Sequence, residues 1–257
     1  MNKTETDNSN VIIFGASGGI GSRLAERLVE GGSSVMLAAR PSDRLTSLSS
    51  QLGMPSCSVE ATDFESVEQC FIAAREQFGT VDGCVNCVGS ILLKPAHLTS
   101  AKEFSDVISA NLTSSFAMVR AAGKIMSSSG GSAILLSSAA ARMGLASHEA
   151  IAAAKAGIIG LAKSAAATYA ARGLRFNVVA PGLVKTELSR KIWENPISAA
   201  ASESMHPLGR LGEPDDIASL IDWLLQPSNN WVTGEVFSID GGLAMVRPNP
   251  RPAKKSR

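Results

Sequence analysis

Short apolar runs alternate with helix-like segments along nearly the whole of this 257-residue chain. The runs that we expect to be strands are Val11–Phe14, Val35–Ala39, Ser56–Glu60, Val81–Val88, Ala133–Ser137, Arg175–Ala180 and Val236–Ile239. The segments with helical patterning are Arg23–Glu30, Asp43–Leu52, Ser66–Phe78, Ala101–Met126, Glu149–Ala171 and Asp215–Leu225. Apolar strands joined by helical crossovers are typical of a parallel sheet covered on both faces. We therefore predict an α/β fold: a single doubly wound, Rossmann-like parallel sheet of about seven strands with right-handed crossovers.

Composition favours one globular domain. The formal net charge is +1 and 45% of residues are hydrophobic, which argues against a basic nucleic-acid footprint and against disorder. No stretch approaches the roughly 18 apolar residues of a membrane span, and residues 1–10 lack the apolar segment of a secretory signal. We expect a flexible stretch at 1–10, one domain over 11–245, and a basic tail at 246–257 that is disordered or, alternatively, docks elsewhere.

Four cysteines lie at 57, 70, 84 and 87. Cys84 and Cys87 form an isolated C-x-x-C pair, a spacing that can indicate zinc or redox chemistry. They fall in an expected strand, where residues three apart point to opposite faces of the sheet. Two thiols so arranged cannot hold one metal ion, so we expect structural cysteines and no metal site. Reduced cysteines are typical of a cytoplasmic protein.

A glycine-rich loop joins the first strand to the first helix. The run after the strand is Gly15-Ala16-Ser17-Gly18-Gly19-Ile20-Gly21. The first glycine permits a tight turn, the middle one lets backbone approach a pyrophosphate, and the last lets the helix pack against the strand. The position of the loop favours dinucleotide binding over a plain glycine turn. The residues expected to contact the cofactor are Gly15, Ser17, Gly19, Ile20 and Gly21.

The end of the second strand indicates which dinucleotide is bound. Folds specific for NAD carry an acidic residue there, which bonds the ribose 2′-hydroxyl. This chain has Ala39 followed by Arg40, and a guanidinium pairs with a 2′-phosphate in a bidentate manner. Ser42 would add a hydroxyl. We predict that NADP(H) is preferred over NAD(H); the alternative is that Arg40 is a surface residue at the strand end.

Further motifs follow in order along the chain. They are Asn86-Cys87-Val88-Gly89, Asn111 in Ala110-Asn111-Leu112, Leu136-Ser137-Ser138, Lys155-Ala156-Gly157, Pro181-Gly182 with Thr186, Pro207-Leu208-Gly209-Arg210, and Asp240-Gly241-Gly242. Together with the glycine loop they resemble the short-chain dehydrogenase/reductase family over about residues 11–243, and most closely its 3-oxoacyl-carrier-protein reductase branch. Phe14 is one departure, because the family usually has threonine there.

The resemblance implies a set of site residues. Its catalytic members would be Asn111, Ser138 and Lys155: the asparagine holds a relay water, the serine bonds the substrate oxygen, and the lysine binds the nicotinamide ribose. Its further cofactor contacts would be Glu60, Asn86, Gly89, Lys155, Pro181, Gly182 and Thr186. Asp63 is interpreted as the N-cap of the following helix. The resemblance also implies a homotetramer, with the segment 231–242 and the helix 149–171 at its interfaces.

One catalytic position departs from the family pattern. The family has a tyrosine thirteen residues after its serine and four before its lysine, and both spacings lead to residue 151, which is isoleucine here. Tyr169 is the one tyrosine in the chain. It lies fourteen residues beyond Lys155, which is about 21 Å along a helix, so it cannot substitute.

His148 is the candidate replacement for the missing acid. It precedes Lys155 by seven residues, so both would lie on one helix face with Ile151 between them, and Ser147 would be the N-cap. The alternative is an exposed histidine in the first helical turn. His97 and His206 have no recognisable partners and are interpreted as incidental. The segment 183–208, which carries Trp193, resembles the family's substrate lid.

The resemblance and the cofactor motifs together predict an NADP-dependent oxidoreductase that acts on a carbonyl/alcohol pair of a small-molecule substrate, with an atypical proton donor. The first alternative is an NADP(H)-binding sensor or inactive subunit without hydride transfer, for which Ile151 is the argument. A lyase or dehydratase on the same scaffold is a second alternative, because a fold alone does not define chemistry.

Overall fold

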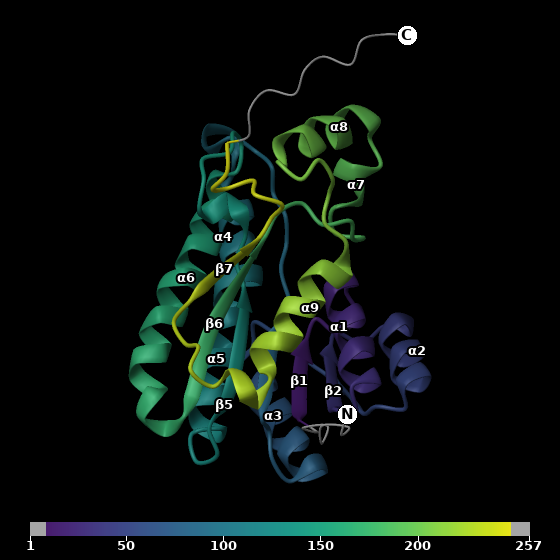
Figure 1. Ribbon diagram of the computed structural model, residues 1–257, viewed down its shortest axis with the longest axis vertical. Coiled ribbons are helices and arrows are strands. Elements are labelled where there is room, and N and C mark those ends of the chain that lie inside the picture. The colour runs from purple at the N-terminus through teal and green to yellow at the C-terminus, as the bar shows by residue number, and fades with distance from the viewer. Residues whose placement is uncertain (1–8, 248–257) are drawn as a thin grey trace, which may run out of the picture.

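The computed structural model describes residues 9–247. Its described residues form one seven-stranded sheet in the order β3-β2-β1-β4-β5-β6-β7, and every strand pair is parallel (Figure 1). The strands are β1 (Asn10–Phe14), β2 (Ser34–Ala39), β3 (Ser56–Ser58), β4 (Gly83–Asn86), β5 (Gly131–Leu136), β6 (Leu174–Pro181) and β7 (Val236–Ile239). The predicted doubly wound parallel sheet is confirmed. Residues 1–8 and 248–257, which hold most of the expected flexible start and basic tail, lie outside the described part of the chain.

The helices cover both faces of this sheet. One layer holds α1 (Gly19–Glu30), α2 (Asp43–Leu52) and α9 (Pro214–Leu225). The other holds α3 (Phe64–Phe78), α4 (Ala101–Ile108), α5 (Ser114–Ile125) and α6 (Glu149–Tyr169). Two short helices, α7 (Arg190–Trp193) and α8 (Pro196–Met205), follow β6 and project from one end of the molecule (Figure 1). Strand order reverses between β1 and β4, and ligands of open α/β sheets bind at the strand ends beside such a point.

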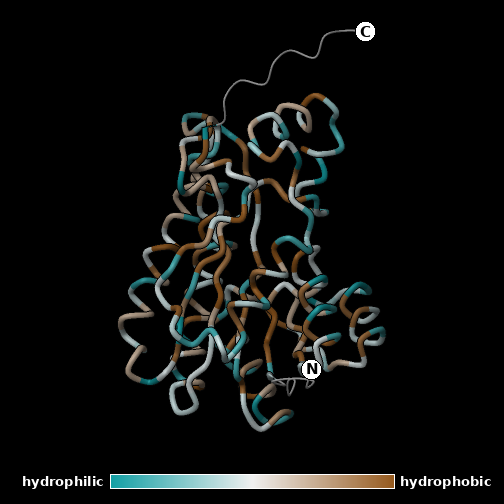
Figure 2. Tube along the Cα trace, in the orientation of Figure 1, coloured by the Kyte–Doolittle hydropathy of each residue, from teal (hydrophilic) through white to brown (hydrophobic). Residues whose placement is uncertain are grey.

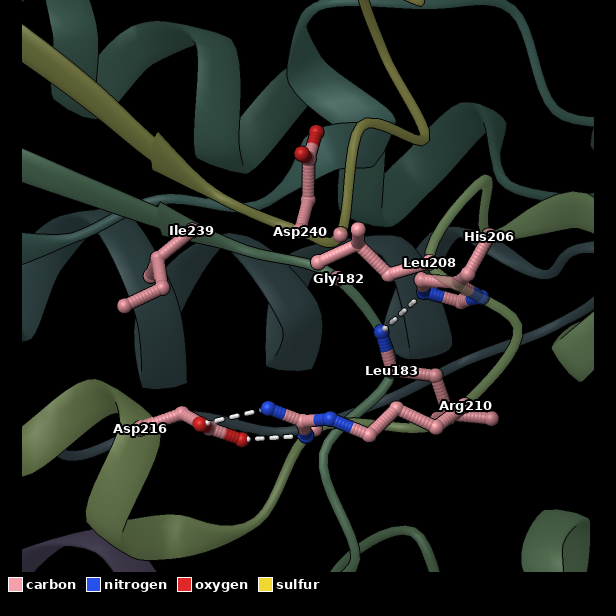
Figure 3. A pocket seen from close by; sticks show the side chains of 10 residues that line it. Gly182, Leu183, His206, Leu208, Arg210, Asp216, Ile239 and Asp240 are labelled. Atoms are coloured by element: carbon pink, nitrogen blue, oxygen red, sulfur yellow. Dashed lines mark hydrogen bonds and ion pairs between the residues drawn. The ribbon is translucent and has the colours of Figure 1, made fainter. Parts of the chain in front are cut away.

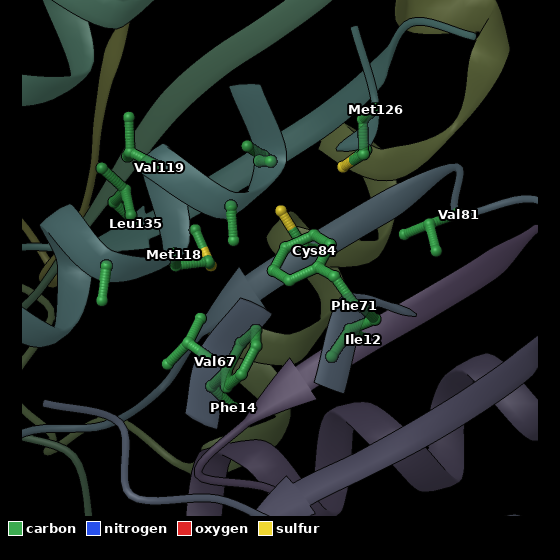
Figure 4. Packing of buried hydrophobic residues seen from close by; sticks show 14 of the residues in the cluster. Ile12, Phe14, Val67, Phe71, Val81, Cys84, Met118, Val119, Met126 and Leu135 are labelled. Carbon is green, nitrogen blue, oxygen red and sulfur yellow. The ribbon is translucent and has the colours of Figure 1, made fainter. Parts of the chain in front are cut away.

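Alternate residues of each strand enter different core layers. Ile12 and Phe14 pack among α3, α5 and α6, whereas Val11 and Ile13 pack among α1, α2 and α9. Figure 2 shows the hydrophobic colour concentrated on the central strands. In Figure 4 the rings of Phe14 and Phe71 lie together, with centroids 5.8 Å apart. This period of two is what burial on both faces of a sheet requires.

The cysteines follow the same alternation. Cys84 is buried in the layer of α3, α5 and α6, and Cys87 packs against the opposite layer. The four thiols are free. The expectation that Cys84 and Cys87 point to opposite faces is therefore confirmed.

Several element boundaries differ from the sequence-based expectation. Helix α1 begins at Gly19 rather than Arg23, because the glycine loop runs directly into the first turn with Gly18 as N-cap. The predicted helix 101–126 is divided by a π-helical turn, Ser109–Thr113. At this turn the side chain of Asn111, and those of Ser114 and Ser115 at the start of α5, bond to backbone carbonyls one turn earlier. Such side-chain bonds compete with regular helical pairing, and π-turns recur at functional sites.

Helix α6 is the longest element and is unusually apolar. Together with the turn that follows it, as far as Arg172, this helix is long and apolar enough to cross a membrane, with a mean hydropathy of 1.3. The sequence-based expectation that no segment approaches a membrane span did not anticipate this. In this fold it packs against β6 and α4, and 44% of its most apolar 18-residue stretch is buried within the chain. Much of its outer face therefore remains uncovered.

Candidate functional site

The glycine loop lies at the reversal point and is packed so closely that side chains would not fit. Gly15 has φ +76°, and a Cβ there would lie 3.0 Å from the backbone of Cys87 and Val88. A Cβ on Gly21 would lie 2.3 Å from the Gly15 carbonyl, and one on Gly19 would lie 2.9 Å from the Thr186 side chain. Contacts below 3.0 Å are too short for real Cβ atoms. Gly15 and Gly21 are thus required by the surrounding backbone, as the sequence pattern predicted, whereas Gly19 is crowded by a side chain.

A cleft of about 560 Å³ runs along this loop. Its lining includes Gly15, Ser17, Gly19, Ile20 and Gly21 from the loop, Arg40 and Ser42 after β2, Gly89 after β4, and Thr186 after β6. A second cavity of about 430 Å³ continues past Arg40 and Gly89 to Glu60. Volumes of a few hundred Å³ suit a small-molecule cofactor. The glycine cradle and the helix N-terminus behind it fit a dinucleotide diphosphate.

Arg40 stands where the two cavities meet. It is exposed and has no ion pair within residues 9–247. Nearby, Ser42 is the N-cap of α2, and its hydroxyl oxygen accepts from the Leu45 N–H at 3.3 Å. Glu60 lines the second cavity, and its carboxylate accepts from the Thr62 hydroxyl at 2.9 Å. An unpaired guanidinium beside a helix N-terminus forms a positive subsite for a phosphate.

Asn86 is buried below the cleft instead of lining it. Its amide nitrogen donates to the hydroxyls of Ser114 and Ser115, each at 3.1 Å, and its amide oxygen accepts from the Val88 N–H at 3.0 Å. These bonds hold the turn that carries Gly89. Asn86 therefore acts on the cleft indirectly, because its bonds hold the backbone of the turn that carries Gly89.

The π-helical turn brings Asn111 against this loop. Its amide nitrogen donates to the Ser90 hydroxyl at 3.0 Å and to the Val107 carbonyl at 2.9 Å. A Cβ on Gly89 would lie 2.9 Å from the amide oxygen of Asn111 and 3.5 Å from Nζ of Lys155. Gly89, Asn111 and Lys155 thus meet at one point, although 66 residues separate the first from the last.

Lys155 is the buried cation of the site. Its Nζ donates to the Leu136 carbonyl at 2.8 Å, and only 8% of its surface is exposed. Burial lowers the pKa of Lys155 to about 8, because removal from water disfavours the charged form. A second bond joins the same two elements: the Ser137 hydroxyl donates to the Lys155 carbonyl at 2.8 Å.

Ser138 follows directly at the end of β5. Its hydroxyl oxygen caps a short 3-10 turn, Ala139–Ala141, by accepting from the Ala140 N–H at 3.2 Å. It is half-buried, so its hydroxyl proton is available to a ligand. The bonds of Lys155 and Ser137 fix this strand end against α6.

Ile151 lies in a small apolar cluster of its own. It is 5% exposed and belongs to a cluster with Val107, Ala150 and Ala154, against which Leu92 packs. A tyrosine at this position would supply a hydroxyl, which isoleucine lacks. The side chains around this part of α6 are therefore apolar.

His148 is the N-cap of α6, so the expectation that Ser147 caps the helix is wrong. Ser147 has φ +62°, in the left-handed region, and this sharp turn moves the helix start one residue later. The Nδ1 atom of His148 lies 2.7 Å from the Ala146 carbonyl. The ring is half-buried and lines neither cavity of the cleft.

The loop after β6 is held by a histidine that was interpreted as incidental. Pro181 is buried, and Gly182 lines a separate cavity of about 200 Å³ together with His206. Figure 3 shows the His206 ring bonded to the backbone of Leu183. The sequence offered no signal for this role, because residue 206 lies 23 positions away along the chain. His97, by contrast, lies exposed in a short 3-10 turn.

The expected lid is ordered as helices α7 and α8. Trp193 donates from its indole N–H to the Thr186 carbonyl at 2.8 Å, and the Ser189 hydroxyl also bonds the backbone around Thr186. Asn195 caps α8 by accepting from Ile197 and Ser198. The expected lid therefore rests directly on Thr186, which borders the cleft along the glycine loop.

Comparisons with known proteins agree with this geometry. The family described as Enoyl-(Acyl carrier protein) reductase matches residues 15–244. The 3-oxoacyl-[acyl-carrier-protein] reductase FabG of Vibrio harveyi is 35% identical over 238 residues, covering 91% of this chain and 97% of its own. The D-threitol dehydrogenase of Mycolicibacterium smegmatis is 32% identical over 245 residues, covering 93% and 94%.

A solved structure has the same fold over almost its whole length. A short-chain type dehydrogenase/reductase from Mycobacterium ulcerans superposes with a TM-score of 0.89 at 27% identity, covering 94% of this chain and 91% of its own. Both the sequence relatives and this structure extend across the glycine loop, the lysine helix and the lid. The chain therefore belongs to the short-chain dehydrogenase/reductase family of oxidoreductases.

Proposed function

We propose that this protein is an NADP(H)-dependent oxidoreductase that interconverts a carbonyl and an alcohol on a small molecule, with His148 as proton donor in place of tyrosine. Members of the family use NAD(P)(H). The observation that carries the proposal is the meeting of Gly89, Asn111 and Lys155 beside the cleft. Burial of Lys155 costs about 3 kcal/mol, as its lowered pKa indicates, and groups with strongly shifted pKa values cluster at functional sites.

The nucleotide subsites support NADP(H) over NAD(H). Arg40 would pair with a 2′-phosphate, which the α2 N-terminus and Ser42 would also favour. The glycine loop would hold the diphosphate through backbone N–H groups. When bound, the cofactor supplies or accepts a hydride. Lys155 would hold the ribose hydroxyls, and the Ser138 hydroxyl would donate a hydrogen bond to the substrate oxygen and so orient the substrate.

His148 supports proton transfer by the way its ring is held. A carbonyl can only accept a hydrogen bond, so the contact with the Ala146 oxygen fixes the proton on Nδ1. In the imidazolium form Nε2 then carries the second proton and can release it to an alkoxide. The donation would be direct or through a water near Ser138.

Two pairs of variants test this function in assays with NADPH and a panel of carbonyl compounds. The panel includes 3-oxoacyl thioesters and keto forms of polyols, because the relatives are named for these classes. His148→Ala should lower turnover at least about tenfold with NADPH affinity unchanged, as loss of a general acid does. His97→Ala is the matched control, since it removes an exposed histidine of the same chain.

The second pair of variants tests position 151, where the family has a tyrosine. Ile151→Tyr should raise reductase activity, whereas Ile151→Phe, which adds the ring without the hydroxyl, should not. Equal activities of these two variants would contradict a proton-transfer role for this position. If His148→Ala is as active as wild type, the proton comes from solvent or Lys155 instead.

A nucleotide-binding protein without hydride transfer is the second candidate. The specific observation in its favour is the apolar cluster around Ile151, which puts hydrocarbon where the family has a phenol. Tight NADPH binding by wild type, with no turnover on the panel by wild type or by Ile151→Tyr, would support this alternative and refute the enzyme.

A further inference from the structure

His206 is a buried imidazole with a hydrogen-bond partner on each ring nitrogen. It lies at the end of α8 and is 3% exposed. Its Nδ1 lies 2.6 Å from the Ser202 carbonyl, within the lid helix. The backbone N–H of Leu183, in the loop after β6, donates to its Nε2 at 3.2 Å (Figure 3). One ring thus joins the lid to the loop beside the cleft.

The partners determine which nitrogen carries the proton. The Ser202 carbonyl can only accept and the Leu183 N–H can only donate, so Nδ1 is protonated and Nε2 is not. Only a neutral imidazole satisfies both bonds. A backbone N–H left buried without an acceptor is costly, so the bond to Leu183 contributes to holding that loop in place.

The ring also lies very close to Gly182, and both residues line the cavity of about 200 Å³. A Cβ on Gly182 would lie 2.6 Å from Nε2 of His206 and 3.1 Å from Cα of Asp240. On the other side, the Leu208 N–H donates to the Gly241 carbonyl at 3.1 Å. The imidazole therefore lies beside the ends of β6 and β7. The bond from the Leu183 N–H and the close approach to Gly182 connect the end of the lid to the backbone at 182–183.

That backbone leads directly into the cofactor cleft. Thr186 follows three residues after Leu183 and lines the cleft, close enough to Gly19 to crowd a side chain there. The indole of Trp193, in the lid, also bonds the Thr186 carbonyl. The lid is thus fastened at both ends of the segment 183–186, by His206 at the first residue and by Trp193 at the last.

We propose that His206 is a positioning residue that couples the lid to the segment 182–186 and thereby shapes the half of the cofactor site farthest from the adenine. This inference rests on the proposed binding of NADP(H). The subsites proposed for the adenine half are Arg40, which lines both cavities, and Glu60 in the second cavity, which neither Thr186 nor His206 lines. A defect at His206 should therefore weaken binding of the nicotinamide half alone.

Two substitutions test the two hydrogen bonds of the His206 ring separately. His206→Gln can place its amide oxygen near the position of Nε2 and so keep an acceptor for the Leu183 N–H. His206→Asn has a shorter side chain, which can donate to the Ser202 carbonyl but cannot reach Leu183. Neither variant adds volume beside Gly182. His97→Asn, at an exposed site, is the matched control.

The affinity of each variant is measured by titration calorimetry for two ligands, NADPH and 2′-phospho-ADP-ribose, which lacks the nicotinamide ring. His206→Asn should bind NADPH about tenfold more weakly, the effect of one unsatisfied buried donor. Its affinity for 2′-phospho-ADP-ribose should stay within about twofold of wild type. His206→Gln should recover most of the NADPH affinity. Trypsin should also cut His206→Asn faster at Arg190 and Lys191, because the lid is released at one end.

Three outcomes would overturn the coupling. Equal NADPH affinity in His206→Asn and wild type would show that the bond to Leu183 does not matter. Parallel weakening for both ligands would indicate general destabilisation. Equal loss in His206→Asn and His206→Gln would assign the effect to the ring shape rather than to the acceptor. A wild-type protein that binds neither ligand would refute the proposed function, and this coupling with it.

Discussion

The Nζ of Lys155 donates to the backbone carbonyl of Leu136 at 2.8 Å, which fastens α6 to the end of β5. The Ser137 hydroxyl donates to the Lys155 carbonyl, which makes a second hydrogen bond between the same two elements. Both bonds are independent of the side chain at 151. The lysine is therefore held by the strand, and the departure at Ile151 leaves its position intact.

The first prediction concerns the stability cost of this buried lysine. The pKa of Lys155 is about 8 in the folded protein, against an ordinary value of 10.5. That difference of 2.5 units corresponds to about 3 kcal/mol. Lys155→Met removes this cost but leaves the Leu136 carbonyl without this donor, at about 1 kcal/mol. We expect Lys155→Met to raise the free energy of unfolding by about 2 kcal/mol at pH 7, measured by urea titration, while NADPH binding is weakened.

The pH dependence has a defined direction. Between pH 8 and 10.5 the unfolded chain keeps the proton that folded Lys155 has released, so wild-type stability rises with pH in this window. Lys155→Met lacks this contribution, and its advantage should shrink as pH approaches 10.5. Lys163→Met, on the exposed side of the same helix, is the control. A Lys155→Met protein less stable than wild type at pH 7 would contradict the argument.

The second prediction concerns cofactor choice. NADPH should bind at least about tenfold more tightly than NADH, a difference of roughly 1.4 kcal/mol. The reason is the unpaired guanidinium of Arg40 at the junction of the two cavities. Arg40→Ala should remove the preference by weakening NADPH alone, as followed by fluorescence titration. Arg75→Ala, on the exposed side of α3, should change neither affinity; equal affinities in wild type would refute the assignment.

The third prediction concerns assembly into a homotetramer. Along α6 the exposed positions follow helical spacing, at Ala153, Ala156 and Gly160, and these small residues allow another helix to approach closely. Trp231, in the segment 231–242, is 96% exposed. Light scattering at micromolar concentration should give the mass of four chains. Ala156→Arg should reduce it by introducing a long charged side chain, whereas Gln51→Arg on α2 should not; a monomeric wild type would contradict the proposal.

The sequence alone determined that this protein is a parallel sheet with helices on both faces. Alternating apolar runs and helical segments specify a parallel sheet, because strands buried on both faces must be apolar throughout and parallel strands need crossovers. The glycine loop and Arg40, predicted from their places after strands, and Glu60, implied by the family resemblance, line the two cavities, and their contact with a cofactor stays a prediction. Strand and helix ends were less predictable: β4 ends at Asn86 rather than Val88, and a π-turn divides the helix at Asn111.

The tertiary structure alone decided which distant groups touch. Resemblance to the family motifs could identify Lys155 and Asn111, but their meeting at Gly89 depends on how α6 and the π-turn pack against the loop after β4. His206 carried no local signal, and its partners at Ser202 and Leu183 appear only when the lid folds back onto β6. Local patterns report which face of an element is buried, because burial is periodic along the chain. Contacts between elements depend on three-dimensional packing, which has no period in the sequence.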